Sequence, residues 1–140
     1  MDRPGENGFE DPLLRRVAEF LDERFGLETL WLFGSEAQGR ATPLSDVDVA
    51  VLLTKRPPAE EWLQTLGDVD GLYGKHVDLV DLERASPILA MQVLRHGRLL
   101  EDKNPSRRIA FTCKTLSMYE DLKIFRRPME EALLARYRDG

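Results

Sequence analysis

The chain has 140 residues, of which 42% are hydrophobic and 32% charged, and this fits one globular domain with a modest core. Its 25 acidic and 20 basic residues give a formal net charge of −5, so no basic excess indicates direct nucleic-acid binding. The single cysteine excludes an internal disulfide, and no run approaches the roughly 18 apolar residues of a membrane span. We therefore expect a cytoplasmic protein without membrane contact.

The first 26 residues predict a polar segment followed by a helix. Residues 1–10 are polar and contain glycines, and we expect them to be mobile. Asp11 and Pro12 are typical of a helix cap and first helical position, and apolar residues then recur at helical spacing as far as Phe25. Gly26 should end this helix.

Four strands are expected along the next part of the chain. Residues 27–33 and 46–53 are strongly apolar runs, and a third run covers residues 76–82. The second run is apolar on both of its faces, so helices should cover both sides of the sheet. Residues 98–101 predict a short strand at an edge. The expected fold class is α/β, with a small mixed sheet flanked by helices.

The segment between the second and third strands predicts a helix and then a loop. Residues 58–66 have a helical pattern, with Trp62 and Leu63 expected on the buried side. Residues 67–75 contain three glycines and are expected to form a connection without regular structure. An Asp-x-Asp pair in that connection, Asp68 and Asp70, is therefore interpreted as part of a loop.

The last third of the chain predicts a capped helix and then a helical extension. Ser86 and Pro87 should start a helix that ends at Gly97. We expect a polar link after the edge strand, and then helix broken or kinked at Pro128, because proline removes a backbone hydrogen bond. The expected division is a catalytic domain over residues 1–103 and a helical extension over 104–140.

The most informative stretch joins the first two strands. An apolar run ends in Gly34-Ser35, and ten residues then separate this pair from Asp46-Val47-Asp48. Residues two apart in a strand share a face, so the two carboxylates should project together. Paired carboxylates repel one another unless a cation lies between them, and Mg²⁺ prefers such hard oxygen ligands.

A third acid completes the predicted cluster. Asp78 lies in the third strand and could bind metal and act as a base; two metal ions would then hold the attacking and leaving oxygens of a displacement. Asp81 is a rival, although it lies where that strand ends. His76 could touch substrate, although an exposed histidine without such a role is more common. The glycine at position 34 would let backbone approach a phosphate closely.

These residues resemble a known family. The pattern Gly34-Ser35-x-Ala37-x-Gly39-x-Ala41, followed by Ser45-Asp46-x-Asp48, is similar to the signature of the DNA polymerase β-type nucleotidyltransferases. The resemblance covers roughly residues 11–101, and the compact length resembles the minimal nucleotidyltransferases. Members of that branch are typically antitoxins paired with a helical HEPN-domain toxin.

The resemblance implies roles for single residues. Gly34 and Ser35 would hold the nucleotide phosphates, with further contacts from Arg40 and Ser45. Asp46, Asp48 and Asp78 would be the catalytic acids and would bind two Mg²⁺ ions. The chain departs from many relatives at Glu36 and Gln38, where those carry basic residues, and this bears on nucleotide affinity.

The function implied is Mg²⁺-dependent transfer of AMP from ATP to a tyrosine hydroxyl of a partner HEPN toxin, which would silence the toxin. Two alternatives stay open. The chain could be an antitoxin that acts by binding alone, with a vestigial site, or it could be a small-molecule enzyme of the aminoglycoside nucleotidyltransferase kind. The small size leaves little room for a substrate domain and favours a protein acceptor.

Overall fold

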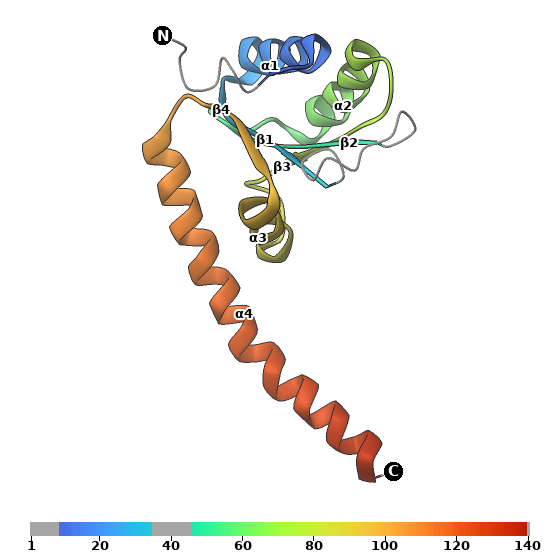
Figure 1. Cartoon of the computed structure of the whole chain (residues 1–140), viewed down its shortest axis with the longest axis vertical. Coiled ribbons are helices and arrows are strands. Elements are labelled where there is room, and N and C mark those ends of the chain that lie inside the picture. Colours follow the sequence, from blue (N-terminus) through green and yellow to red (C-terminus); the bar gives the residue numbers. More distant parts are fainter. Residues whose placement is uncertain (1–8, 35–45, 140) are drawn as a thin grey trace.

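The computed structural model describes residues 9–34 and 46–139. In chain order the elements are α1 (Pro12–Phe25), β1 (Leu27–Phe33), β2 (Val47–Leu53), α2 (Ala59–Tyr73), β3 (Val77–Asp81), α3 (Pro87–His96), β4 (Arg98–Asp102) and α4 (Pro105–Asp139). Figure 1 shows a sheet between two layers of helices, with α4 leaving the globular part as a long projecting helix. The predicted α/β class is confirmed.

The four described strands form one mixed sheet in the order β3-β2-β1-β4. β1 pairs antiparallel with β2 and with β4, whereas β2 and β3 are parallel. The expected edge position of the last short strand is therefore confirmed. Because β2 lies in the middle of the sheet and is buried, its alternate side chains pack in the cores on the two faces of the sheet.

Alternate residues of β2 face two separate cores. Val47, Val49 and Val51 pack with residues of α1 and α2 on one face. Ala50 and Leu52 pack on the other face, against α3 and the first part of α4. The prediction that helices cover both faces is confirmed, and α1 with α2 lies opposite α3 in Figure 1. Asp48 belongs to the same alternation as Ala50 and Leu52 and so faces the α3 side.

Two of the predicted helix starts have the expected caps. The carboxylate of Asp11 accepts a hydrogen bond from the Leu13 backbone N–H at 2.9 Å, with Pro12 as the first helical residue. The Ser86 hydroxyl likewise accepts one from Leu89 N–H at 3.2 Å. Such caps satisfy backbone donors that the first helical turn leaves open. The sequence therefore locates α1 and α3 correctly.

The expected loop over residues 67–75 is wrong, because α2 continues to Tyr73. Thr65 and Val69 are fully buried, and they continue the helical spacing that starts at Trp62. The two glycines inside the helix face open space and cost about 1 kcal/mol each relative to alanine, which burial of this face offsets. Leu63 is 68% exposed, so its predicted burial is also wrong.

The expected break at Pro128 does not occur, since α4 is one helix from Pro105 to Asp139. The strong helix formers that follow, in the run Glu-Glu-Ala-Leu-Leu-Ala-Arg, support helix on the far side of the proline. The helix begins at Pro105, within the expected polar link. The Asn104 side chain accepts a hydrogen bond from Arg107 N–H at 3.2 Å and caps this helix start.

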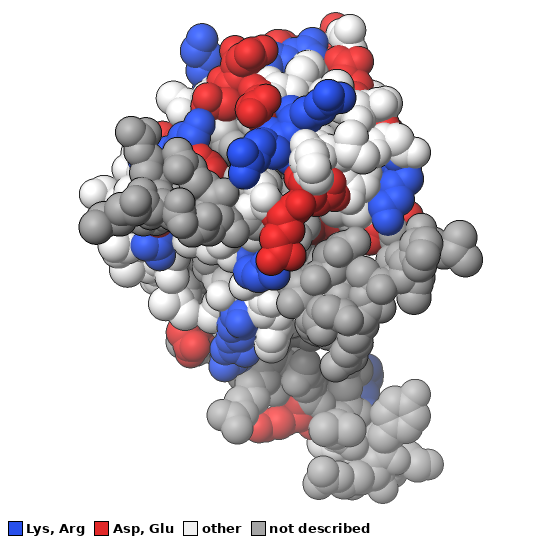
Figure 2. Space-filling view, turned by 45° about the horizontal axis from the view of Figure 1, so that its top comes forward, with Lys and Arg blue, Asp and Glu red and all other residues white. Residues whose placement is uncertain are grey.

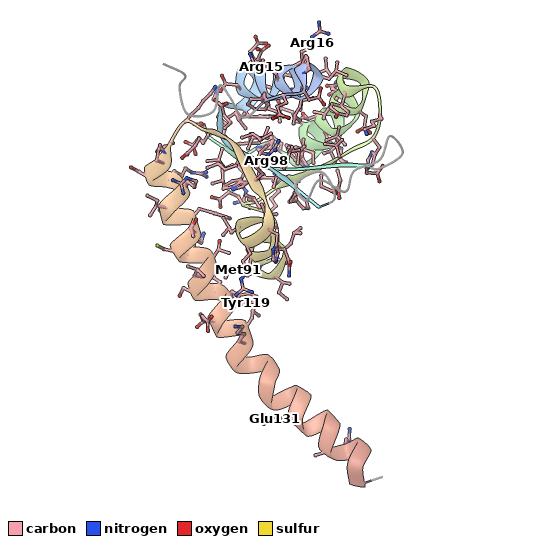
Figure 3. All side chains as sticks on the ribbon, in the orientation of Figure 1. Arg15, Arg16, Met91, Arg98, Tyr119 and Glu131 are labelled. Carbon is pink, nitrogen blue, oxygen red and sulfur yellow. The ribbon has the colours of Figure 1, made fainter. Side chains whose placement is uncertain are left out.

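Charge is distributed over the surface without a single dominant sign. Figure 2 shows acidic and basic side chains next to one another across the visible face of the globular part. In Figure 3, Arg16 points away from the sheet on the outer side of α1, and Arg98 lies over the strands. Within residues 9–34 and 46–139, no helix has the length and apolar character needed to cross a membrane.

Candidate active site

Gly34 brings the end of β1 against the carboxylate of Asp48. It has a φ of +69°, a conformation that favours glycine, and it directly follows the last residue of β1. A Cβ added at this position would collide with Oδ2 of Asp48. The absence of a side chain is therefore what lets backbone and carboxylate lie side by side. The predicted approach of this backbone to a phosphate stays a prediction.

Sheet register places two of the three predicted acids side by side. Asp48 lies opposite Phe33 on β1 and is paired with Asp78 on β3. Paired residues of neighbouring strands share a face, so both carboxylates are on the α3 side. On the other face the preceding pair, Val47 and Val77, is buried in the core.

The third predicted acid, Asp46, is two residues before Asp48 in the chain. It lies immediately before β2 and is exposed, as is Asp78, whereas Asp48 is half-buried between its two neighbouring strands. With the side chains in these positions, no three Asp, Glu, His or Cys residues of the described part approach closely enough to form a metal-binding group. The metal-ligand role of the three acids stays a prediction. The structure provides the Asp48–Asp78 pairing and places Asp46 directly before β2.

Asp81 lies apart from the other acids of its region. It is three positions after Asp78 on β3, so it faces the α1 and α2 side, and it is 5% exposed. Burial is the main cause that raises its pKa, while the Glu83 N–H and the nearby Arg84 guanidinium act in the opposite direction. Its position makes Asp78 the better candidate for the third acid.

His76 and Asp70 join the site, and the sequence analysis gave Asp70 no role. The Asp70 carboxylate accepts a hydrogen bond from Val77 N–H at 2.8 Å, and its second oxygen lies 3.2 Å from Nδ1 of His76. The Asp70 contact is the main cause that raises the pKa of His76, and the negative charges of Asp46 and Asp78 add to it. His76 therefore lies within electrostatic reach of two predicted acids.

The signal for this contact is visible in the sequence once α2 is extended. Asp70 stands four residues before Gly74, which ends the helix with a positive φ, and the Gly74 N–H binds the Asp70 carbonyl at 2.9 Å. An aspartate in the last helical turn can thus reach forward to the start of the next strand. Its backbone hydrogen bond to Val77 is also the main cause that lowers its pKa.

The predicted phosphate-binding residues are only partly within the described chain. Gly34 is described, but Ser35, Arg40 and Ser45 lie outside the described residues, as do Glu36 and Gln38. The nucleotide contacts expected of Ser35, Arg40 and Ser45, and the expected effect of Glu36 and Gln38 on nucleotide affinity, therefore stay predictions.

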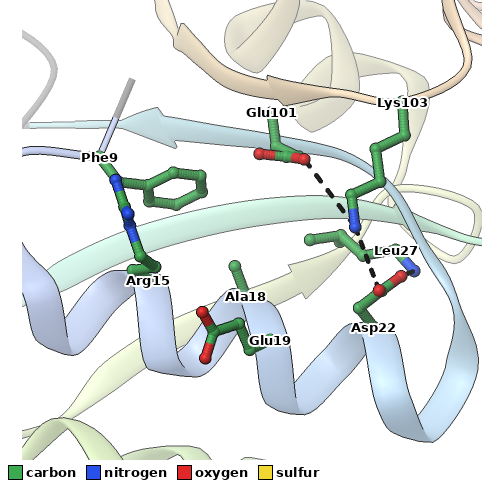
Figure 4. Close-up of a pocket in the computed structure, with 8 residues that line it drawn as sticks. All are labelled: Phe9, Arg15, Ala18, Glu19, Asp22, Leu27, Glu101 and Lys103. Carbon is green, nitrogen blue, oxygen red and sulfur yellow. Dashed lines mark hydrogen bonds and ion pairs between the residues drawn. The ribbon is translucent and has the colours of Figure 1, made fainter. Parts of the chain in front are cut away.

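Two cavities of the described part lie away from the acids. One of about 180 Å³ is bordered by α1 and the end of β4, where Lys103 lies 3.1 Å from Asp22 and 3.9 Å from Glu101 (Figure 4). Another of about 230 Å³ lies where β2 and β3 end, and Asp81 and Arg107 are among its lining residues. The Gly34–Asp48 contact lies at the other end of the sheet, so neither cavity is part of the candidate active site.

Comparisons with known proteins agree with this geometry. Residues 15–106 match the family model described as "Polymerase beta, Nucleotidyltransferase". The protein adenylyltransferase MntA of Shewanella oneidensis is 32% identical over 109 residues, which cover 78% of each chain.

Solved structures agree as well. A crystal structure of a toxin-antitoxin with AMP-PNP has a TM-score of 0.72 at 29% identity and covers 85% of this chain and 97% of the other. An MNT antitoxin in complex with the tri-AMPylated Shewanella oneidensis HEPN toxin has a TM-score of 0.68 at 26% identity and covers 86% and 92%. The chain therefore belongs to the polymerase β-type nucleotidyltransferase family, in its minimal, MntA-like branch.

Proposed function

We propose that the chain is a protein adenylyltransferase that transfers AMP from ATP to a tyrosine hydroxyl of a partner HEPN toxin and so acts as its antitoxin. The observation that carries this proposal is the Asp48–Asp78 pair beside Gly34, in a chain similar over most of its length to MntA. The tri-AMPylated HEPN toxin in complex with an MNT antitoxin indicates the kind of acceptor.

The donor set suits Mg²⁺. Asp46, Asp48 and Asp78 offer only carboxylate oxygens, and such hard ligands are those that Mg²⁺ prefers. Asp48 and Asp78 are paired on one face of the sheet, and Asp46 directly precedes β2. These residues would hold one or two ions. When bound, Mg²⁺ would neutralise charge on the transferring phosphate and its leaving group.

The reaction itself is a displacement at the α-phosphorus of ATP. The tyrosine oxygen forms a bond to that phosphorus, and the bond from the phosphorus to the bridging oxygen of the β-phosphate breaks. Pyrophosphate leaves with the bonding electron pair. Asp78, which is the exposed residue of the Asp48–Asp78 pair, would accept the hydroxyl proton. Gly34 would keep backbone close to the triphosphate, because no Cβ separates them.

We also keep the proposed division of the chain, with residues 1–103 as the catalytic part and 104–140 as an extension. Phe111 and Thr115 of α4 are buried, Phe111 in the core shared with α3, and Tyr119 lies under the Arg95 guanidinium at 5.4 Å from the ring centre. Beyond this, Figure 1 shows α4 running away from the other elements. The projecting part would be available to a partner protein.

The test is incubation of the purified chain with labelled ATP and Mg²⁺, with and without a candidate HEPN partner such as the product of the neighbouring gene, followed by intact mass. We expect the mass of AMP on the HEPN protein, none after EDTA, and none with the D46N/D48N double variant. Mg²⁺ with a non-hydrolysable ATP analogue should raise the melting temperature of the wild-type chain and leave that of the double variant unchanged.

Different failures have different meanings. A stable complex that still neutralises the toxin without added mass would support an antitoxin that acts by binding alone. Transfer of AMP to a small-molecule hydroxyl, with no protein acceptor modified, would support the aminoglycoside-type alternative. Either result would overturn the proposed function.

A further inference from the structure

His76 occupies the side of the candidate site that faces away from the phosphate-binding turn. Gly34 at the end of β1 contacts Asp48 of β2, and β3 lies beyond β2 in the sheet. The order across the site is therefore Gly34, then Asp48, then Asp78, with His76 just before β3. His76 and the turn are thus separated by the full width of the acid group.

In-line displacement gives this separation a chemical meaning. The attacking oxygen and the leaving oxygen lie on opposite sides of the phosphorus. If the triphosphate tail is held at the Gly34 side, as the proposed function states, pyrophosphate leaves toward β1. The acceptor must then approach from the side of β3, which is an edge strand of the described sheet.

His76 has an exposed and oriented side chain that can contact a molecule approaching from this side. Its side chain is 61% exposed, and its Nδ1 is held by an Asp70 oxygen at 3.2 Å. The same carboxylate binds the Val77 N–H, so the imidazole is tied to the start of the strand that carries Asp78. With Nδ1 engaged, Nε2 is the ring atom left for a ligand.

We propose that Nε2 of His76 hydrogen-bonds the acceptor hydroxyl and holds it on the side of the α-phosphate opposite pyrophosphate, with Asp70 as the positioning residue that orients the imidazole. The proposal rests on the proposed function. It does not depend on the charge of the ring: a neutral Nε2 accepts a hydrogen bond from the hydroxyl, and a protonated one donates to its oxygen.

Two substitutions of His76 distinguish the contribution of Nδ1 from that of Nε2. The amide of asparagine reaches about as far as Nδ1, and the amide of glutamine about as far as Nε2. H76N should keep the Asp70 contact and lose the acceptor contact, lowering kcat/KM for the HEPN protein about tenfold, the usual effect of losing one hydrogen bond. H76Q should retain most of this activity. Affinity for a non-hydrolysable ATP analogue should stay within about twofold in both variants.

Asp70 has a matched control on its own helix. In D70N the amide oxygen can still bind the Val77 N–H, while its NH₂ group faces Nδ1 and reverses the hydrogen bonding of the imidazole. Asp68 instead binds Arg24 at 2.8 Å, on the surface between α1 and α2. We expect D70N to lower kcat/KM for the acceptor several-fold without changing ATP-analogue affinity, and D68N to change neither.

The outcomes are distinguishable. Unchanged acceptor kinetics in H76N, or a parallel loss of ATP-analogue affinity, would overturn the assignment of His76 to the acceptor side while AMP transfer by the wild-type chain still stands. No transfer by the wild-type chain would overturn the proposed function and this inference together. Melting temperatures of all four variants close to wild type would establish that the kinetic differences arise in folded protein.

Discussion

Carboxylates gather at both ends of the sheet, and the two groups have different surroundings. At the end where β2 and β3 finish, four acids from different elements pair with three arginines. The pairs are Arg107 with Glu28 and with Glu83, each at 2.8 Å, Arg108 with Asp102 at 2.9 Å, and Arg84 with Asp81 at 3.7 Å. We call these seven residues the arginine network.

At the opposite end, the exposed acids Asp46 and Asp78 form no ion pair within residues 9–34 and 46–139. His76 lies within electrostatic reach of both acids, but its own contact is to Asp70. Arg98 also lies at this end of the sheet, opposite Leu32 of β1. Because like charges on one face repel, folding alone does not explain this arrangement. The arginine network joins β1, β4 and α4 to the segment after β3, whereas the binding role of the acids near Gly34 stays a proposal.

The largest expected effect separates the two acid groups by activity. Asp48→Asn should lower the rate of AMP transfer by about 10²–10³-fold, because it removes a carboxylate that stabilises transition-state charge through the metal. Asp81→Asn, at the other end of the sheet, should change the rate by no more than about threefold. Initial rates at saturating ATP measure both. An equal loss in the two variants would abolish the distinction between the two ends.

A second substitution should affect stability and leave the chemistry intact. Arg107 bridges Glu28 of β1 and Glu83 beyond β3, and Glu28 is only 14% exposed. The Nη1–Oε2 contact has the distance of an ion pair, although both atoms lack a partner by hydrogen-bond geometry. Arg107→Met would leave the largely buried Glu28 carboxylate without its cation and with the Asn104 amide at 3.4 Å as a hydrogen-bond donor. This should lower the free energy of unfolding by about 1–3 kcal/mol.

Lys114→Met is the matched control for this substitution. It removes one positive charge from the same helix at an exposed position. Denaturant unfolding should show little change for this variant, and both variants should transfer AMP at the wild-type rate per folded molecule. Equal destabilisation of the two would mean that the Arg107 pairs contribute no more than a general charge effect.

The sequence predicts well what depends on neighbours in the chain. The caps at Asp11 and Ser86 and the strand limits of β1 follow from local pattern. It fails where tertiary contacts outweigh local preference. Burial of Thr65 and Val69 keeps α2 helical past its glycines.

Parts of the candidate site could not be predicted for the same reason. The pairing of Asp48 with Asp78 is a register between strands separated by a helix, and no local pattern specifies it. The side-chain bonds of Asp70 depend on the turn that brings β3 back to the end of α2. Asp70, whose contacts depend on how two elements meet, was therefore missed, while Asp46, Asp48 and Asp78 were each predicted from the pattern around their own strand.

The smallest expected effect concerns the pH dependence of stability at Asp81. Burial raises its pKa above the ordinary value of 3.8, so the folded chain holds this proton more tightly than the unfolded chain does. The resulting stabilisation is fully present below pH 3.8 and is lost as the pH rises through the folded-state pKa. Asparagine cannot ionise, so the melting temperature of D81N minus that of wild type should increase over this interval and then level off.

The carboxylates with the opposite shift provide the internal check. Hydrogen bonds from Leu27 N–H to Asp22 and from Val77 N–H to Asp70 lower the pKa of each, so their contribution is lost as the pH falls below 3.8. Both proteins share that acid loss, and it cancels in the difference between them. Thermal unfolding of D81N and wild type across pH 3–8 measures the difference between their melting temperatures. A difference that stays constant, or decreases as the pH rises, would mean that Arg84 and Arg56 compensate the buried charge of Asp81 completely.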